Sequence, residues 1–246
     1  MIEKMKKFCW LTLFLVVILV KVSVAQKLKL LFFHRPPYYV YDKDGVRGII
    51  LNRTIYVLKQ AKVEFELELS TPNRIIASFK RGDKNICSPG WFKTKERTRW
   101  AKFSIPIYEN RPVVLLTGKW NNGLIKKHFL SDIFRSRSLT WGRIKNFSYG
   151  DVIEKYQKEF RPKVVNIEGN QLNLINMLRY KRFSYILISP EEIDFLIASA
   201  GYDKKDFLII HLNDVKEGNK RYLMFSKDIS DNLIEKINKT IFRLYK

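Results

Sequence analysis

The segment Ser88–Tyr108, SPGWFKTKERTRWAKFSIPIY, says more about the fold than any other part of this chain. Gly90 and Trp91 precede the sequence Thr-Lys-Glu-Arg, and Phe-Ser-Ile-Pro-Ile-Tyr follows closely. This order places the permanent positive charge of Arg97 beside a turn whose backbone N–H groups and aromatic rings suit a small anion. Because several other basic residues are close by, a solvated basic loop is the alternative interpretation.

The sequence before this segment alternates between strand and helix patterns. Strands are expected at residues 27–33, 65–69 and 86–88, and helices at residues 48–61 and 73–80. Gly82 follows the second helix, where it suits a left-handed cap. Strand, helix and strand in this order predict a largely parallel α/β sheet.

A second series of the same kind follows the segment, and it predicts a second α/β unit. Further strands are expected at residues 112–117, 138–143, 164–167, 185–188 and 207–212. Helices are expected between them at residues 151–160, 171–180 and 191–199. The chain then returns through residues 220–227 and ends in an amphipathic helix at residues 228–244.

The order of these features resembles the type 2 periplasmic solute-binding proteins. The likeness is to the family-3 extracellular solute-binding group, which includes receptors for polar amino acids. That family carries Thr-x-x-Arg followed by Phe-Ser-x-Pro-Tyr, and the matching residues here are Thr94, Arg97, Phe103, Ser104, Pro106 and Tyr108. Its upstream Pro-Pro-aromatic motif and two glycines correspond to Pro36, Pro37, Tyr38, Gly45 and Gly48.

The resemblance implies a two-lobed type 2 periplasmic-binding-protein fold. Each lobe is then a mixed, mainly parallel sheet flanked by helices, and two strands form the hinge. Lobe 1 is expected to comprise residues 26–113 and 221–246, and lobe 2 residues 114–220, after a signal peptide at residues 1–25. Clefts between domains are common ligand sites, and hinge motion closes such lobes around a ligand.

Residues 1–25 have the three parts of a secretory signal peptide. Lysines at the start precede an apolar run at residues 8–20, and Ser23-Val24-Ala25 supplies small residues for cleavage. The run is short for a membrane span, which needs about 20 apolar residues. We therefore expect cleavage after Ala25 and a periplasmic location, with an uncleaved membrane anchor as the alternative.

In lobe 1, the resemblance implies that Arg97 forms a salt bridge with an anionic group of the ligand, usually a carboxylate. Gly90 lets the backbone approach the ligand because glycine has no side chain. Tyr38, Tyr39 and Trp91 are candidate walls of the site. The alternative for each aromatic residue is packing in the core.

In lobe 2, Ser148 and Tyr149 resemble the family loop that caps the ligand at a helix N-terminus. Free backbone N–H groups at such a terminus bind anions. Ser148 as an ordinary helix N-cap is the alternative.

Two departures from the family pattern concern the ligand's charge. Phe92 replaces a threonine before the Thr-x-x-Arg motif, and Ser189 stands where amino-acid receptors carry the aspartate that pairs with an ammonium group. Ser189 is therefore a candidate site residue, and Glu191 or Glu192 replaces the aspartate if the alignment slips. Arg35 adds a second positive charge near the site or lies at the surface.

Composition restricts the class of partner. A net charge of +22 suits nucleic acid, an anionic membrane surface or anionic solutes. The basic residues are scattered, and no zinc finger or RNA-binding aromatic motif is present, so no nucleic-acid partner is expected. Cleavage leaves the lone Cys87, expected as a buried apolar filler, and no histidine pair has ligand spacing. We expect neither a metal nor a cofactor.

The sequence thus predicts a monomeric periplasmic solute-binding protein that captures a small anionic or carboxylate-bearing solute between its lobes. Its expected partners are that ligand and a membrane permease, as in ABC transport of amino acids, or a sensor. One alternative is a dehydratase-like enzyme on the same fold, for which Glu191, Glu192 and His34 are the candidate acids and bases. Another is a membrane-anchored basic protein without a small ligand.

Overall fold

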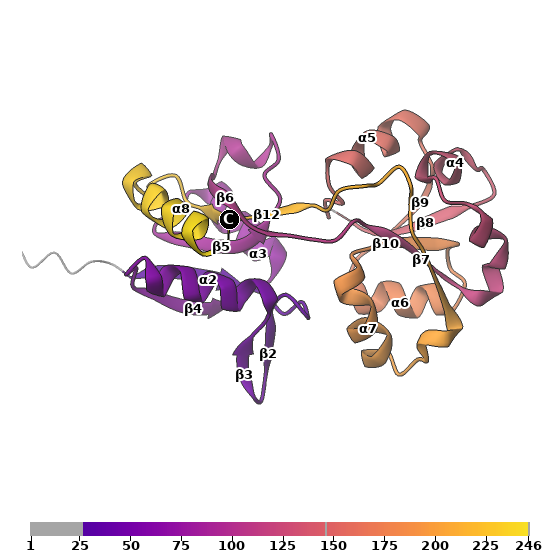
Figure 1. Cartoon of the computed structure of the whole chain (residues 1–246), viewed down its shortest axis with the longest axis horizontal. Coiled ribbons are helices and arrows are strands. Elements are labelled where there is room, and N and C mark those ends of the chain that lie inside the picture. The colour runs from indigo at the N-terminus through magenta and orange to yellow at the C-terminus, as the bar shows by residue number, and fades with distance from the viewer. Residues whose placement is uncertain (1–26, 146, 246) are drawn as a thin grey trace, which may run out of the picture.

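The computed structural model describes residues 27–145 and 147–245, which form two lobes, each built on a five-stranded sheet (Figure 1). The first sheet has the order β4 (Phe65–Leu69), β1 (Leu28–Phe32), β5 (Ile86–Trp91), β12 (Lys220–Phe225) and β6 (Lys102–Glu109). The second has the order β11 (Phe207–Ile210), β7 (Val114–Gly118), β10 (Tyr185–Ile188), β8 (Thr140–Ile144) and β9 (Lys163–Ile167). A hairpin of β2 (Val40–Asp42) and β3 (Gly45–Arg47) projects from the first lobe (Figure 1).

Helices accompany both sheets. The first lobe contains α2 (Ile49–Gln60), α3 (Pro72–Arg81), the short 3-10 helix η1 (Arg97–Arg99) and α8 (Asp231–Tyr245). The second contains η2 (Lys119–Lys126), α4 (Leu130–Arg135), α5 (Asp151–Phe160), α6 (Gln171–Arg179), α7 (Pro190–Ser199) and η3 (Lys204–Asp206). No helix in the described part of the chain combines the length and the apolar character that crossing a membrane requires.

Strand directions show that both sheets are mixed, as the predicted fold class requires. Strand β1 runs parallel to β4 and β5, whereas β12 is antiparallel to β5 and β6. In the second sheet, β8 runs parallel to β9 and β10, and β7 is antiparallel to β10 and β11. The chain crosses between the lobes after β6 and again before β12 (Figure 1).

The ends of α3 show how local sequence sets an element. Its N-cap is Thr71, whose hydroxyl accepts a hydrogen bond from the backbone N–H of Arg74 at 3.4 Å, and Pro72 follows as the first helical residue. Gly82 ends the helix in the left-handed conformation, with φ at 82°. The predicted glycine cap is therefore confirmed.

Three elements differ from what the sequence analysis expected. Strand β6 covers residues left unassigned by the sequence; its Pro106 lacks an N–H donor, and the position at the edge of the sheet tolerates that loss. Strand β5 continues to Trp91 rather than stopping at Ser88. Helix α4, which no predicted element covered, forms because Leu130, Ile133 and Phe134 pack into the core as one helical face.

Cys87 is fully buried in the core of lobe 1, where it packs as the expected apolar filler. Burial raises the pKa of its thiol, which keeps it unreactive. Residues 27–145 and 147–245 contain no cluster of histidine, cysteine, aspartate and glutamate side chains suited to a metal ion. The predicted signal peptide lies outside the described residues.

Candidate ligand-binding cleft

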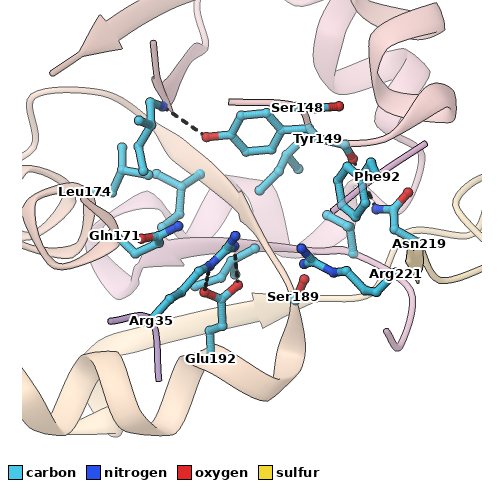
Figure 2. Close-up of a pocket in the computed structure, with 15 residues that line it drawn as sticks. Arg35, Phe92, Ser148, Tyr149, Gln171, Leu174, Ser189, Glu192, Asn219 and Arg221 are labelled. Carbon is cyan, nitrogen blue, oxygen red and sulfur yellow. Dashed lines mark hydrogen bonds and ion pairs between the residues drawn. The ribbon is translucent and has the colours of Figure 1, made fainter. Parts of the chain in front are cut away.

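Two adjoining cavities lie between the lobes. The first, here called the Arg97 cavity, has a volume of about 70 Å³ and is lined by Trp91, Phe92 and Arg97 from lobe 1 and by Phe147 and Ser148 from lobe 2. The second, here called the Glu192 cavity, has a volume of about 40 Å³ and is lined by Tyr149, Gln171, Leu174, Ser189 and Glu192, among others (Figure 2). Four residues line both cavities: Arg35, Phe92, Ser148 and Arg221.

Arg97 is the first residue of η1, which residues 92–96 connect to β5, and its side chain lines the Arg97 cavity. Its Nη1 donates to the carbonyl oxygen of Phe92 at 3.0 Å, and the guanidinium carbon lies 4.9 Å from the ring centre of Trp91. Burial lowers the pKa of Arg97, and the charges of Glu96 and Glu154 oppose that effect. Arg97 also lines a solvent-open groove of about 960 Å³.

Arg221, on the crossing strand β12, was not among the predicted site residues. It is only 5% exposed; its Nε donates to Oδ1 of Asn110 at 2.5 Å and its Nη1 to the carbonyl oxygen of Gly90 at 3.2 Å. Burial lowers the pKa of Arg221, and the positive charge of Arg35 lowers it further. The sequence feature that could have indicated a buried role for Arg221 is its position directly before the apolar run YLMF.

Arg35 and Glu192 form an ion pair that joins the two lobes (Figure 2). Nε and Nη2 of Arg35 donate to the two carboxylate oxygens at 2.8 and 3.0 Å. The side chains are 12% and 2% exposed, so a surface position for Arg35 is wrong. Burial alone lowers the pKa of Arg35, but the charge and hydrogen bonds of Glu192 outweigh burial and raise it. With its amide oxygen turned toward Arg35, Gln171 accepts a further hydrogen bond from Nε at 3.1 Å.

Gly90 and Trp91 both line the Arg97 cavity. Gly90 has a φ of 78°, and an added Cβ would lie 1.6 Å from Oη of Tyr39. Glycine is therefore required here for the contact with Tyr39 as well as for the open face of the cavity. The indole N–H of Trp91 donates to Oγ of Ser88 at 2.7 Å, which holds the ring in place.

Tyr38 and Tyr39 pack in the core of lobe 1 and line neither cavity. This position agrees with the alternative interpretation, in which both rings pack in the core. The hydroxyl of Tyr39 donates to the carbonyl oxygen of Pro89 at 2.9 Å, and that of Tyr38 accepts a hydrogen bond from the amide of Asn110. Both rings lie behind the cleft, where they support Gly90 and Asn110 rather than a ligand.

Ser148 lines both cavities, but it does not cap α5. Gly150 is the N-cap residue, and the hydroxyl of Ser148 donates to the carboxylate of Glu154. Asp151 and Glu154 occupy the first turn of α5, and their negative charges oppose binding of an anion at this terminus. The N-cap alternative for Ser148 is therefore wrong.

Tyr149 and Ser189 both line the Glu192 cavity. The hydroxyl of Tyr149 accepts a hydrogen bond from the backbone N–H of Ile144 at 3.0 Å, which fixes the ring against the strand end. Ser189 is the N-cap residue of α7, and its side chain makes no capping hydrogen bond. The structure therefore brings both residues to the cleft beside Glu192.

Each candidate acid or base of the enzyme alternative has a hydrogen-bond partner, although Oε2 of Glu191 is buried without one among the described residues. Nδ1 of exposed His34 accepts a hydrogen bond from the backbone N–H of Tyr41 at 3.2 Å. Glu191 accepts from the hydroxyl of Tyr108 at 3.2 Å and from the N–H of Arg111 at 2.7 Å. Both carboxylate oxygens of Glu192 accept hydrogen bonds from Arg35.

Two mixed α/β sheets, two crossings and a cleft between them define the class of two-lobed periplasmic binding proteins. The sequence profile of the bacterial extracellular solute-binding proteins, family 3, matches residues 33–246, and the chain belongs to that family of binding proteins. Among curated proteins, no sequence matches this chain.

Solved structures show the same fold at low sequence identity. An ancestral arginine-binding protein bound to arginine is 18% identical with a TM-score of 0.68, over 88% of this chain and 91% of that one. The amino acid ABC transporter substrate-binding protein AbpA from Streptococcus pneumoniae, bound to L-arginine, is 22% identical with a TM-score of 0.66, over 89% and 88% of the two chains. The B. pertussis BvgS periplasmic domain is 16% identical with a TM-score of 0.68, over 88% of this chain and 40% of that one.

Proposed function

We propose that this protein is an extracytoplasmic receptor that captures a small carboxylate-bearing solute between its lobes. The observation that carries the proposal is the charge of the Arg97 cavity. Among the described residues, four cationic side chains line it and no carboxylate does: Arg35, Arg97, Lys145 and Arg221. Oppositely charged groups of a ligand compensate such cations, because a buried charge without a partner is costly.

The walls around this charge suit a small organic molecule rather than an inorganic ion. Trp91, Phe92 and Phe147 present aromatic rings to the same cavity. Ligand pockets typically combine such apolar walls with a few polar groups that orient the ligand. A carboxylate held by Arg97, with its carbon chain against the rings, uses both features.

The family and its relatives support transport or sensing as the purpose of capture. The neighbours named for amino-acid ABC transport and for arginine binding hold ligands that each carry a carboxylate, and BvgS contributes a periplasmic domain of the same fold. We infer that the loaded protein passes its solute, or the signal of its closure, to a partner at the membrane.

A thermal-shift screen of carboxylates, amino acids and other small anions tests the proposal. A ligand at about 100 times its Kd stabilises the native state by about 2.7 kcal/mol, which raises the Tm of a protein this size by roughly 5–10 °C. We expect at least one carboxylate to raise the Tm of wild type and of the control Arg99→Ala, whose side chain is exposed beside Arg97. Arg97→Ala should lose the shift, and equal shifts in all three proteins would contradict the proposal.

A further inference from the structure

We propose, resting on the function above, that Arg221 forms a second anion-binding group in the cleft and that the ligand is a small dicarboxylate. The inference starts from the hydrogen bonds that Arg97 and Arg221 each donate to the backbone of one short segment, Gly90–Phe92. Arg221 donates to the carbonyl oxygen of Gly90 at 3.2 Å, and Arg97 donates to that of Phe92 at 3.0 Å. Both side chains line the Arg97 cavity, so a single ligand there contacts both.

Aromatic rings hold the two guanidinium groups in place. The guanidinium carbon of Arg221 lies 4.4 Å from the ring centre of Phe92, and that of Arg97 lies 4.9 Å from the ring centre of Trp91. Stacking on rings restricts an arginine side chain before a ligand arrives. A carboxylate then meets donors that are already oriented, which lowers the entropy lost on binding.

These two arginines are the cations of the cavity that lack an acidic partner within the described residues. Arg35 is paired with Glu192 at 2.8 Å, and Lys145 is paired with Glu168 at 3.0 Å. Arg97 and Arg221 form hydrogen bonds only with neutral oxygens in that part of the chain. Two uncompensated positive charges therefore remain for the ligand to neutralise.

Arg221 still has donors available for a ligand. Its Nη2 forms no hydrogen bond with any described residue, and Figure 2 shows its guanidinium group pointing into the pocket. Asn110 holds the Nε side of the same group, and Tyr38 in turn contacts the amide of Asn110. The buried residues thus orient one edge of the guanidinium group and leave the other toward the cleft.

Among the described residues, Glu192 is the one carboxylate that lines either cavity, and Asp151 and Glu154 line the solvent-open groove outside them. Ser189 lines the Glu192 cavity in place of an acid, and both oxygens of Glu192 accept hydrogen bonds from Arg35. Within the two cavities, an ammonium group would have to displace Arg35 from Glu192 to gain a counter-charge. A second carboxylate on Arg221 requires no such displacement.

Isothermal titration calorimetry with matched ligand pairs tests this inference. Succinate, glutarate and adipate are each compared with their monoamides, which keep the length and shape but carry one charge less. A charge-assisted hydrogen bond is worth roughly a tenfold to hundredfold difference in Kd. We expect at least one dicarboxylate to bind wild type more tightly than its monoamide by that factor.

Arg221→Gln should remove the difference in Kd between that dicarboxylate and its monoamide, because neither ligand then meets a positive charge at this position. The control Lys220→Gln, an exposed neighbour on the same strand, should retain the full difference. Circular dichroism establishes that each variant is folded. Should Arg221→Gln not fold, the comparison of the two ligands on wild type decides the question.

Three results overturn the inference. The first is equal affinity of wild type for every dicarboxylate and its monoamide, which leaves the proposed receptor function standing. The second is a difference that persists in folded Arg221→Gln. The third is tighter binding of an α-amino acid, such as glutamine or arginine, than of any dicarboxylate. Absence of binding by every carboxylate would instead contradict the receptor function itself.

Discussion

Arg97 and Arg221 have the same side chain, but the sequence identified only Arg97 as a candidate site residue. Arg97 lies in a motif with conspicuous neighbours, Thr94 and Trp91. Arg221 lies in a strand, where alternation predicts only that one of Lys220 and Arg221 points inward. The structure shows Lys220 exposed and Arg221 buried, because β12 lies between β5 and β6 and turns Arg221 toward Gly90.

Gly90→Ala should destabilise the protein and impair ligand binding. The backbone has a φ of 78°, and the new methyl group would lie 1.6 Å from Oη of Tyr39. A non-glycine residue in this region costs about 1–3 kcal/mol before any steric clash is added. We expect the free energy of unfolding, measured with urea, to fall by at least that amount.

Gly123→Ala is the matched control. Gly123 is exposed, and an added Cβ there meets nothing within 4 Å. Its effect on the free energy of unfolding should be small. Similar losses in the two variants would show that the space around Gly90 relaxes.

Alkaline pH should destabilise the fold through its buried tyrosines. Burial raises the pKa of Tyr149 to about 12, whereas a tyrosine in the unfolded chain ionises near pH 10. The unfolded state therefore loses a proton first, and the free energy of unfolding falls between about pH 10 and pH 12 by up to about 1.4 kcal/mol per pH unit for this residue.

Urea unfolding at pH 9, 10 and 11 measures this dependence. Tyr149→Phe should show a smaller fall in stability with pH than wild type, although it is less stable at pH 9 because the N–H of Ile144 loses its partner. The control Tyr180→Phe alters a side chain that is 71% exposed and should retain the wild-type slope. Identical slopes in all three proteins would exclude Tyr149 as a contributor.

Helix α6 shows how an element places residues in the cleft. It begins immediately after Asn170, so that Gln171 and Leu174 in its first turn line the Glu192 cavity. Oδ1 of Asn170 accepts from the N–H of Asn173 at 3.1 Å, and Oδ1 of Asn173 accepts from the N–H of Asn170 at 2.9 Å. This reciprocal pair fixes the start of the helix.

Asn170→Ala should lower the free energy of unfolding by about 1 kcal/mol, the usual loss when an N-cap side chain is removed. Urea denaturation at neutral pH measures it. Asn232→Ala, an exposed site in the first turn of α8, is the control and should have little effect. Equal stability of wild type and Asn170→Ala would mean that packing alone sets the start of α6.

Across the whole molecule, the Arg35–Glu192 pair ties one lobe to the other. The two cavities, at about 70 and 40 Å³, are smaller than the 300–1,000 Å³ or so typical of ligand pockets. We therefore expect the lobes to separate when a ligand enters these cavities, and separation would break this pair. On this expectation, the ion pair favours the closed arrangement of the lobes.

Glu192→Gln should shift the protein toward an open arrangement of the lobes. Loss of one charge from a buried pair typically costs about 3–5 kcal/mol, and opening lets water solvate Arg35. Small-angle X-ray scattering of the ligand-free variant should show a larger radius of gyration than wild type. Glu168→Gln, which breaks an exposed pair with Lys145, should not change it. An unchanged radius for Glu192→Gln would show that other contacts hold the lobes together.

Local patterns in the sequence predicted much of the secondary structure. Helix α5 and strands β4 and β10 begin and end where the sequence predicted, because hydrophobic periodicity, caps and turn residues act over a few positions. The same signals identified Gly82 as a cap and Cys87 as a core residue. Motif order identified the family, and it directed attention to Arg97.

The sequence could not predict which side chains contact one another in the cleft, because these contacts join residues far apart in the chain. Arg35 and Glu192 are 157 positions apart, and Gly90 and Arg221 are 131 apart. The sequence around Tyr38 and Tyr39 fits either a position against a ligand or a position in the core. The tertiary structure decided which side chains face the cleft and which face the core. The free energy of burying a charge or a ring depends on the groups that distant parts of the chain place beside it.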